Sequence, residues 1–174
     1  LGYVNYWSIL NSLDFGIPQN RERIFVVSIR KDIPKYFDFE KLERKPMRPL
    51  IEFLDKQVRW NNVETVFKEY TNFYTFPRSS DGKLINGAYN RAWKQDKYVG
   101  TIPVSNIPKI ADIKQNQLLY RHLTPRECWR LMGFTDLDFD KVLLSGIGKN
   151  NLYLLAGNSI VVPVLEAIFK ELLL

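Results

Sequence analysis

The polar run Gln19-Asn20-Arg21-Glu22-Arg23 carries the residues best suited to bind an oxyanion. Side chains alternate along an extended backbone, so Gln19, Arg21 and Arg23 point to one side. Two guanidinium groups and an amide that converge there could hold a phosphate or a carbonyl oxygen. Spacing alone favours a simpler interpretation, in which the run is a solvated strand end and Glu22 forms an ion pair. Both interpretations stay open at this point.

A turn and a lone cysteine are the other candidates for chemistry. Gly157-Asn158-Ser159 precedes a predicted helix, where free amides can meet a carboxylate or phosphate, although most such turns are only helix caps. The single cysteine, Cys128, and the single histidine, His122, exclude a disulfide framework and most metal sites. We therefore expect no metal and a reducing, cytoplasmic setting. Cys128 falls on the apolar face of a predicted helix, which favours a packing role over that of a nucleophile.

Length and composition limit the class of protein. A chain of 174 residues that is 45% hydrophobic suffices for one domain, or for one domain with a small appendage. No secretory signal opens it and its longest apolar run is too short for a membrane span, so we expect no membrane partner. The net charge of +6 fits a polyanionic partner.

Most of that charge lies in residues 41–100, which hold 12 Lys and Arg against 7 Asp and Glu. Aromatic residues are interleaved with the basic ones between Trp60 and Tyr98. Such a region suits a surface that grips phosphates and lies against bases. The aromatics equally suit the core of a small β-rich domain. The two roles are compatible, because a small domain needs a core as well as a face.

Two strands are predicted near the start of the chain, over residues 5–10 and 23–29. The second is almost continuously apolar, which is typical of a strand buried on both faces, so the rest of its sheet should come from elsewhere. The first three residues look like the end of a helix. A short helix is expected at 50–54, and short strands between 57 and 110, with a turn at 79–82.

The helix that begins after Thr124 carries the clearest local signals. Thr124 can cap it, Pro125 takes its first position and Glu127 completes a capping box, while Gly133 can end it in a left-handed turn. Further helical segments are predicted over 140–144, 151–156 and, after a break at 157–159, 160–174. The last of these, with Pro163 tolerated in its first turn, should pack beside the strands of the first thirty residues.

Three segments occur in a defined order: P-Q-x-R-x-R at a strand start, R-x-L-T-P-R-E-C-x-R-L-x-G-F at the capped helix, and G-N-S-I-V-V-P-V before the last helix. The sequence resembles the C-terminal part of the DNA cytosine-5 methyltransferases, whose eighth, ninth and tenth conserved motifs these segments match. The resemblance covers essentially the whole chain, with the variable target-recognition region of the family at 41–110.

The resemblance implies an α/β fold. Part of a Rossmann-like methyltransferase sheet with a C-terminal helix would be joined to a small, irregular, mostly-β target-recognition domain. Residues 1–40 would end the catalytic domain, residues 41–120 would form the recognition domain, and residues 121–174 would hold a bracing helix and the helix that returns to the catalytic domain.

Roles for individual residues follow from the same resemblance. Arg21 and Arg23 match arginines that hold the extruded cytosine and nearby phosphates, with Gln19 as support. Asn158 and Ser159 match a turn that contacts the cofactor S-adenosylmethionine. The residues of the ninth motif that we expect to be mainly structural are Arg121, Thr124, Arg126 and Glu127. The candidates for contact with double-stranded DNA are Arg78, Lys83, Arg91, Lys94, Lys97 and Thr101. Thr101 is included because Thr101-Ile102 matches a Thr-Leu pair typical of the family, with isoleucine in place of leucine.

Parts of the family's catalytic apparatus are missing from the sequence. The reaction uses a cysteine in a Pro-Cys dipeptide, a glutamate that contacts the base and a glycine-rich loop that holds the cofactor. Cys128 follows Glu127 instead of a proline. The resemblance therefore implies the DNA-recognition portion of a DNA (cytosine-5-)-methyltransferase, inactive alone, with an N-terminal catalytic half on the same or another chain. The alternative is a separate non-catalytic DNA-binding subunit or a degenerate remnant. The missing initiator methionine favours a piece of a longer enzyme.

Overall fold

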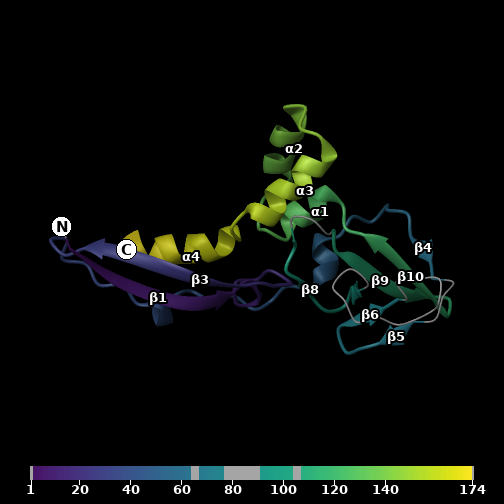
Figure 1. Cartoon of the computed structure of the whole chain (residues 1–174), viewed down its shortest axis with the longest axis horizontal. Coiled ribbons are helices and arrows are strands. Elements are labelled where there is room, and N and C mark those ends of the chain that lie inside the picture. The colour runs from purple at the N-terminus through teal and green to yellow at the C-terminus, as the bar shows by residue number, and fades with distance from the viewer. Residues whose placement is uncertain (1, 64–66, 77–90, 104–106, 174) are drawn as a thin grey trace.

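The structure is a computed structural model that describes residues 2–63, 67–76, 91–103 and 107–173. Figure 1 shows an elongated molecule in which two long strands and the C-terminal helix form an arm, and a mixed sheet forms a body at the other end. Three helices lie at the junction between the arm and the body. Both termini lie on the outer part of the arm.

The arm is built on β1 (Tyr3–Asn11) and β3 (Glu22–Arg30), which pair antiparallel from Tyr3↔Arg30 to Asn11↔Glu22. This confirms both predicted strands. The expected helix end at the start is wrong, because Tyr3 already belongs to β1.

The expectation that the second strand is buried on both faces is also wrong. Val27 and Ile29 are buried, whereas the alternating Ile24 and Val26 are 67% and 60% exposed. Only one face of this two-stranded sheet packs against the rest of the chain, so alternate side chains on β3 meet solvent.

The C-terminal helix α4 (Val162–Leu173) runs along the arm beside β3, as predicted, and Pro163 lies in its first turn (Figure 1). The break before it differs from the prediction. Helix α3 (Lys149–Asn158) includes Gly157 and Asn158, and the chain leaves helical geometry only at Ser159. The segment Lys149–Leu173 is long and apolar enough for a membrane span by length and composition alone. It is weak support for one, because its buried side chains belong to the core.

Helix α1 (Pro125–Arg130) forms as its sequence predicts, with both bonds of the Thr124–Glu127 capping box. Gly133, at φ +87°, ends the following turn, and a Cβ there would lie 2.3 Å from Pro163 Cδ. The turn after α1 therefore packs closely against the start of α4. Helix α2 (Asp136–Leu144) is longer than predicted, because Thr135 and Asp138 form a second capping box.

Within the described residues, the body is a six-stranded sheet with the order β4-β10-β9-β7-β6-β5. The short strands β4 (Asn61–Asn62), β5 (Lys68–Glu69), β6 (Phe73–Thr75) and β7 (Arg91–Lys94) lie where short strands were predicted. The prediction did not extend to most of β9 (Lys109–Lys114) or to β10 (Gln117–His122). β9 and β10 form a hairpin whose turn residues Gln115 and Asn116 have positive φ angles. The predicted turn at 79–82 lies outside the described residues.

A short parallel pair, β2 (Gln19–Asn20) with β8 (Val99–Gly100), joins the arm to the body. One hydrophobic core runs through this junction and includes Leu10, Leu50, Ile102 and Leu131. Single 3-10 turns lie at Ser12–Asp14, Phe39–Lys41 and Leu50–Phe53, the last where a short helix was predicted. The division of the chain at residues 40 and 120 stays a prediction.

Candidate functional site

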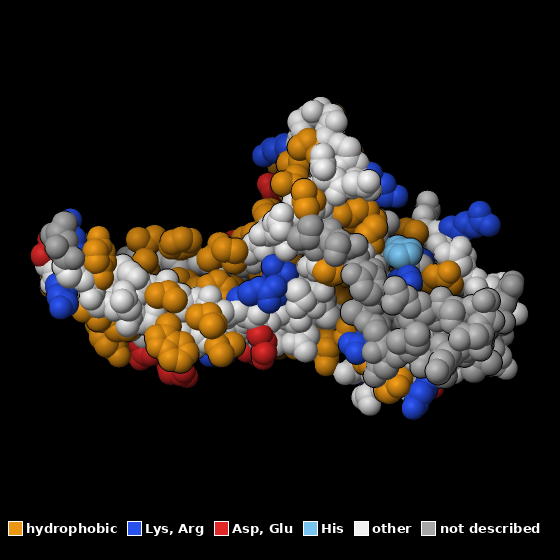
Figure 2. Space-filling model, viewed as in Figure 1, with side chains coloured by type: hydrophobic (Ala, Val, Ile, Leu, Met, Phe, Trp, Pro, Cys, Tyr) orange, Lys and Arg blue, Asp and Glu red, His pale blue; other side chains and the backbone are white. Residues whose placement is uncertain are grey.

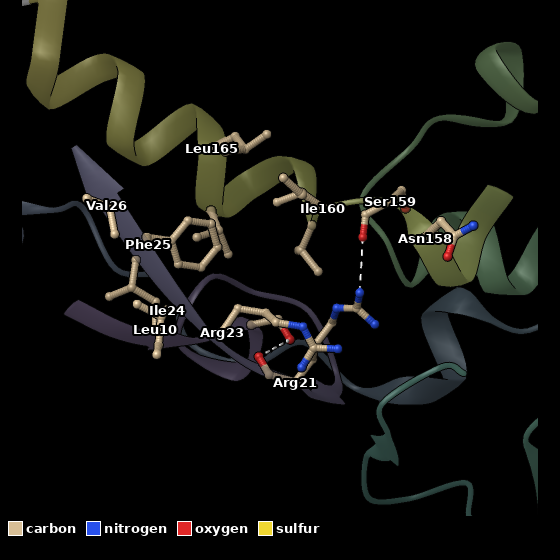
Figure 3. A pocket seen from close by; sticks show the side chains of 13 residues that line it. Leu10, Arg21, Arg23, Ile24, Phe25, Val26, Asn158, Ser159, Ile160 and Leu165 are labelled. Atoms are coloured by element: carbon tan, nitrogen blue, oxygen red, sulfur yellow. Dashed lines mark hydrogen bonds between the residues drawn. The ribbon is translucent and has the colours of Figure 1, made fainter. Parts of the chain in front are cut away.

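A pocket of about 450 Å³ lies where the arm meets the α3–α4 turn. Arg21 and Arg23 line one part of it, Asn158 and Ser159 line another, and apolar side chains of β3 and α4 line the rest (Figure 3). Residues more than 130 positions apart in sequence thus share one cavity, as their separately predicted roles require.

Arg21 is almost entirely buried, with 8% of its surface exposed. Its Nη1 donates to Ile102 O at 3.3 Å, and its Nη2 donates to Gly157 O and Ser159 O, both at 3.2 Å (Figure 3). Burial, and then the nearby charge of Arg23, lowers the pKa of the Arg21 guanidinium. Three carbonyl acceptors compensate the loss of water around this cation.

Gln19 is fully buried beside Arg21. Its Nε2 donates to Leu131 O at 2.8 Å, and its Oε1 accepts from Ile102 N at 3.1 Å. The amide thus ties β2 to the turn after α1 and to the chain just past β8.

Arg23 differs from Arg21 because its side chain is exposed. Its Nη1 donates to the adjacent Glu22 O at 2.6 Å, and within the described part of the chain Glu22 forms no ion pair. The interpretation of this run as a solvated strand end with a Glu22 ion pair is therefore wrong for Gln19 and Arg21, which face the core. Arg23 keeps most of its donors available at the pocket.

The predicted cofactor turn lies at the end of α3. Asn158 is exposed, and Ser159 Oγ donates to Ala156 O at 2.9 Å, so the hydroxyl caps the helix that ends there. Among the described residues, no group of three His, Cys, Asp or Glu side chains is arranged to bind a metal.

Cys128 lies in the hydrophobic core and is completely buried. Burial, and then the charge of Glu127, raises the pKa of its thiol far above the usual value. A thiol held neutral and away from solvent is inert as a nucleophile. This agrees with the packing role predicted for Cys128.

Arg121, Thr124 and Glu127, which we expected to be structural, form a buried polar network under α1. Arg121 donates from Nη1 and Nη2 to the two carboxylate oxygens of Glu127, at 2.8 and 2.7 Å. Glu127 also accepts from the backbone N–H groups of Thr124 and Asp55, at 2.6 and 2.7 Å. A bidentate pair with further backbone donors satisfies most of the polar atoms that burial strips of water.

Asp55 and Arg130 extend this network. Arg130 lies in the motif quoted from the sequence but had no role assigned to it, and Asp55 was missed. Asp55 accepts from Thr124 Oγ1 at 2.9 Å and from Arg130 Nη1 at 2.8 Å. Asp55 lies some 70 positions before its partners, so only the folded chain reveals the contact. Arg126 instead pairs at the surface with Asp140, at 2.5 Å, and that pairing raises its pKa.

The described basic residues that were predicted to contact DNA already contact acidic or aromatic side chains. Lys94 pairs with Glu69 at 2.5 Å, Lys97 pairs with Asp96 at 3.3 Å, and the Arg91 guanidinium lies over the Phe73 ring. The remaining candidates, Arg78 and Lys83, lie outside the described residues.

Thr101 belongs to the junction and not to the sheet. It is exposed, and its Oγ1 donates to Asn20 O at 3.1 Å. The structure therefore brings Thr101 next to the Gln19–Arg23 run, a proximity that the sequence did not indicate.

Comparison with known proteins assigns this architecture to a family. The chain matches the profile of the C-5 cytosine-specific DNA methylases over residues 1–174, and it belongs to that family. It is 38% identical to the type II methyltransferase M2.ScrFI of Lactococcus lactis subsp. cremoris, over 99% of this chain and 46% of that protein. It is 30% identical to the type II methyltransferase M.NgoBI of Neisseria gonorrhoeae, over 98% of this chain and 51% of that protein.

The fold is similar to that of solved methyltransferases. The S. pombe Dnmt2 methyltransferase aligns with 99% of this chain and 58% of its own, with a TM-score of 0.69 and 21% identity. The expected mixed α/β fold with a C-terminal helix is confirmed. The chain spans about half the length of the curated relatives that it matches.

Proposed function

We propose that this chain is the C-terminal, DNA-recognition portion of a DNA (cytosine-5-)-methyltransferase. The complete enzyme transfers a methyl group from S-adenosylmethionine to C5 of a cytosine that is flipped out of a specific sequence in double-stranded DNA. The chain alone does not methylate DNA, because the nucleophile comes from an N-terminal catalytic half. Membership of a family that uses S-adenosylmethionine, together with half-length alignment to its relatives, supports this proposal.

The observation that carries the proposal is the shared pocket of the eighth and tenth motifs. Arg21 and Arg23 reach it from the strand side, and Asn158 and Ser159 reach it from the helix side (Figure 3). A ligand with an apolar ring system and polar substituents fits a cavity with this lining. The residues present therefore fit one edge of S-adenosylmethionine, which supplies the methyl group when bound.

Arg23 is the residue that we assign to the base and its phosphate. Its guanidinium is exposed at the pocket and can donate to a carbonyl or phosphate oxygen. Flipping a base out of the duplex costs a few kcal/mol, so contacts that the extruded nucleotide gains must offset that cost. Basic residues of the body would grip the surrounding backbone meanwhile.

The exposed face of the arm supports the proposed partner half. Trp7, Ile9, Ile24 and Val26 are exposed side chains on the paired strands β1 and β3, and hydrophobic side chains follow the arm in Figure 2. A two-stranded sheet is marginally stable in water unless an apolar face is covered. The rest of a methyltransferase domain, on the same or another chain, would extend this sheet along its edge and cover its apolar face with a second layer.

The state of Cys128 also supports a nucleophile that lies outside this chain. Methyl transfer to C5 needs a thiolate that attacks C6. Cys128 is buried in the core, out of reach of the base, and burial raises the pKa of its thiol so that it stays protonated.

The test is transfer of a labelled methyl group from S-adenosylmethionine to mixed-sequence duplex DNA, by this chain and by the complete natural gene product. We expect activity only in the complete protein. Activity in the chain alone would contradict the proposal. Salt-sensitive DNA binding by both proteins without methylation by either would favour the alternative, a non-catalytic recognition subunit or remnant.

A further inference from the structure

Gln19 and Arg21 bind main-chain groups of three segments that are distant in sequence. These are the chain just after β8, the turn after α1 and the end of α3. The predicted roles of the two side chains, support and base contact, leave this junction unexplained.

Ile102 is held from both sides by this pair. Gln19 Oε1 accepts from its N–H at 3.1 Å, and Arg21 Nη1 donates to its carbonyl oxygen at 3.3 Å. The neighbouring residues are fixed to the same run, because Val99 N donates to Pro18 O and Thr101 Oγ1 donates to Asn20 O. Segment 99–102, where the body meets the arm, is therefore attached rigidly to residues 18–21.

The other half of the Arg21 guanidinium is bound to the end of α3. Nη2 donates to Gly157 O and Ser159 O, each at 3.2 Å. Carbonyls at a helix C-terminus lack intrahelical partners and carry the negative end of the helix dipole. A buried cation is well suited to both features, so Arg21 fixes the path of the chain through Asn158.

Arg21 has few donors to spare for a substrate. Its two terminal nitrogens already contact three carbonyl oxygens in a nearly closed site. Arg23, exposed two residues later at the same pocket, is free of such constraints. The two arginines therefore divide the work between positioning and ligand contact.

We infer that Arg21, together with Gln19, is a positioning residue that couples DNA bound at segment 99–102 to cofactor bound at turn 157–159. One rigid guanidinium holds both segments, so a shift of either changes the hydrogen bonds of the other. DNA that fixes segment 99–102 should thereby tighten cofactor binding, and the cofactor should tighten DNA binding by the same factor. This inference rests on the proposed function.

The experiment measures S-adenosylhomocysteine binding to the complete protein by calorimetry, with and without saturating duplex that the methyl-transfer assay identifies as a substrate. The variants are Arg21→Met, which removes the guanidinium but keeps the stem, Arg21→Lys and Gln19→Leu. Arg30→Met is the matched control, because Arg30 is an exposed arginine of β3 that pairs with Asp32. Hydrogen exchange over residues 99–103 and 157–161 reports the junction itself.

We expect DNA to tighten S-adenosylhomocysteine binding at least about five-fold in the unaltered protein and in Arg30→Met, within the usual range of coupling between sites. The factor should fall to near one in Arg21→Met and Gln19→Leu, and Arg21→Lys should recover part of it. Exchange should rise in both segments together in Arg21→Met. If that variant loses its fold, Arg21→Lys and Gln19→Leu decide the matter.

Unchanged coupling in these variants, or faster exchange in one segment only, would overturn the inference while leaving the proposed function intact. If DNA does not change S-adenosylhomocysteine binding to an active, unaltered protein, the inference is also overturned and the proposed function again stays intact. A complete protein that methylates no duplex would instead count against the proposed function.

Discussion

Removing Arg121 should destabilise the protein far more than removing the neighbouring surface arginine Arg126. Arg121 and Glu127 are both buried, and their bidentate contact at 2.7–2.8 Å lies beneath α1. Arg121→Met would keep the apolar stem and leave the Glu127 carboxylate buried without its counter-charge. Breaking a buried pair from one side costs about 3–5 kcal/mol.

The remaining contacts of Glu127 narrow the expected loss of unfolding free energy. Glu127 would still accept from the N–H groups of Thr124 and Asp55, which places the cost near the lower end, about 3 kcal/mol. Arg121 Nε has no hydrogen-bond partner among the described residues, so its removal recovers part of a desolvation penalty. Arg126→Met is the control: its partners Asp136 and Asp140 are half exposed, and such surface pairs contribute about 0–1 kcal/mol.

Urea unfolding of the complete protein, followed by tryptophan fluorescence, measures both variants. Trp60 lies 5.1 Å from the Arg121 guanidinium and reports on this region. The double variant Arg121→Met/Glu127→Gln should be more stable than Arg121→Met alone, because the buried charge is removed while the amide oxygen can still accept from one of the two backbone N–H groups. A cost for Arg121→Met no greater than that of Arg126→Met, or a double variant less stable than the single one, would refute the reasoning.

Three further predictions follow from the site. Arg23→Ala in the complete enzyme should lower turnover more than DNA affinity, because we propose that the side chain contacts the extruded base. Steady-state kinetics and a binding titration separate the two quantities, and an unchanged rate would remove the proposed role. Cys128 should resist a thiol reagent at pH 8 in the native protein and react once unfolded, because burial keeps its pKa high; rapid native labelling, read by mass spectrometry, would contradict this. The hydrogen bond from Arg130, followed by the nearby positive charges, lowers the pKa of Asp136. Asp136→Asn should therefore destabilise the protein by its full amount above pH 3.8, and the difference from the unaltered protein should disappear as the pH falls further. Melting temperatures that differ equally at all pH values would argue against this ion pair.

Local signals in the sequence predicted local structure well. Thr124, Pro125 and Glu127 lie within four residues, and a capping box needs no other part of the chain. The start of α1 and its capping hydrogen bonds were therefore predictable. The strand assigned to residues 23–29 was equally clear from its β-branched residues. Its burial was not, because alternate exposure of Ile24 and Val26 depends on which other strands are present.

Long-range partners left no comparable signal. Asp55 is one acid among many in a charged stretch, yet it binds Thr124 and Arg130 at the start and end of α1. Nothing in the residues near position 21 indicates that its acceptors lie at 102, 157 and 159. Resemblance to a family identified Arg21 as important, and only the hydrogen bonds distinguish its role from that of Arg23.

These long-range contacts explain how so short a chain can join an arm to a body. The hydrogen bonds by which Gln19 and Arg21 join these parts go to main-chain carbonyl and amide groups, apart from one from Gln19 Nε2 to Met132 Sδ. Backbone groups are present whatever residue occupies the position, so the body can vary in sequence without loss of the junction. In the function that we propose, the body is a recognition region that changes to read different DNA, and such contacts would hold it to a catalytic part that does not change.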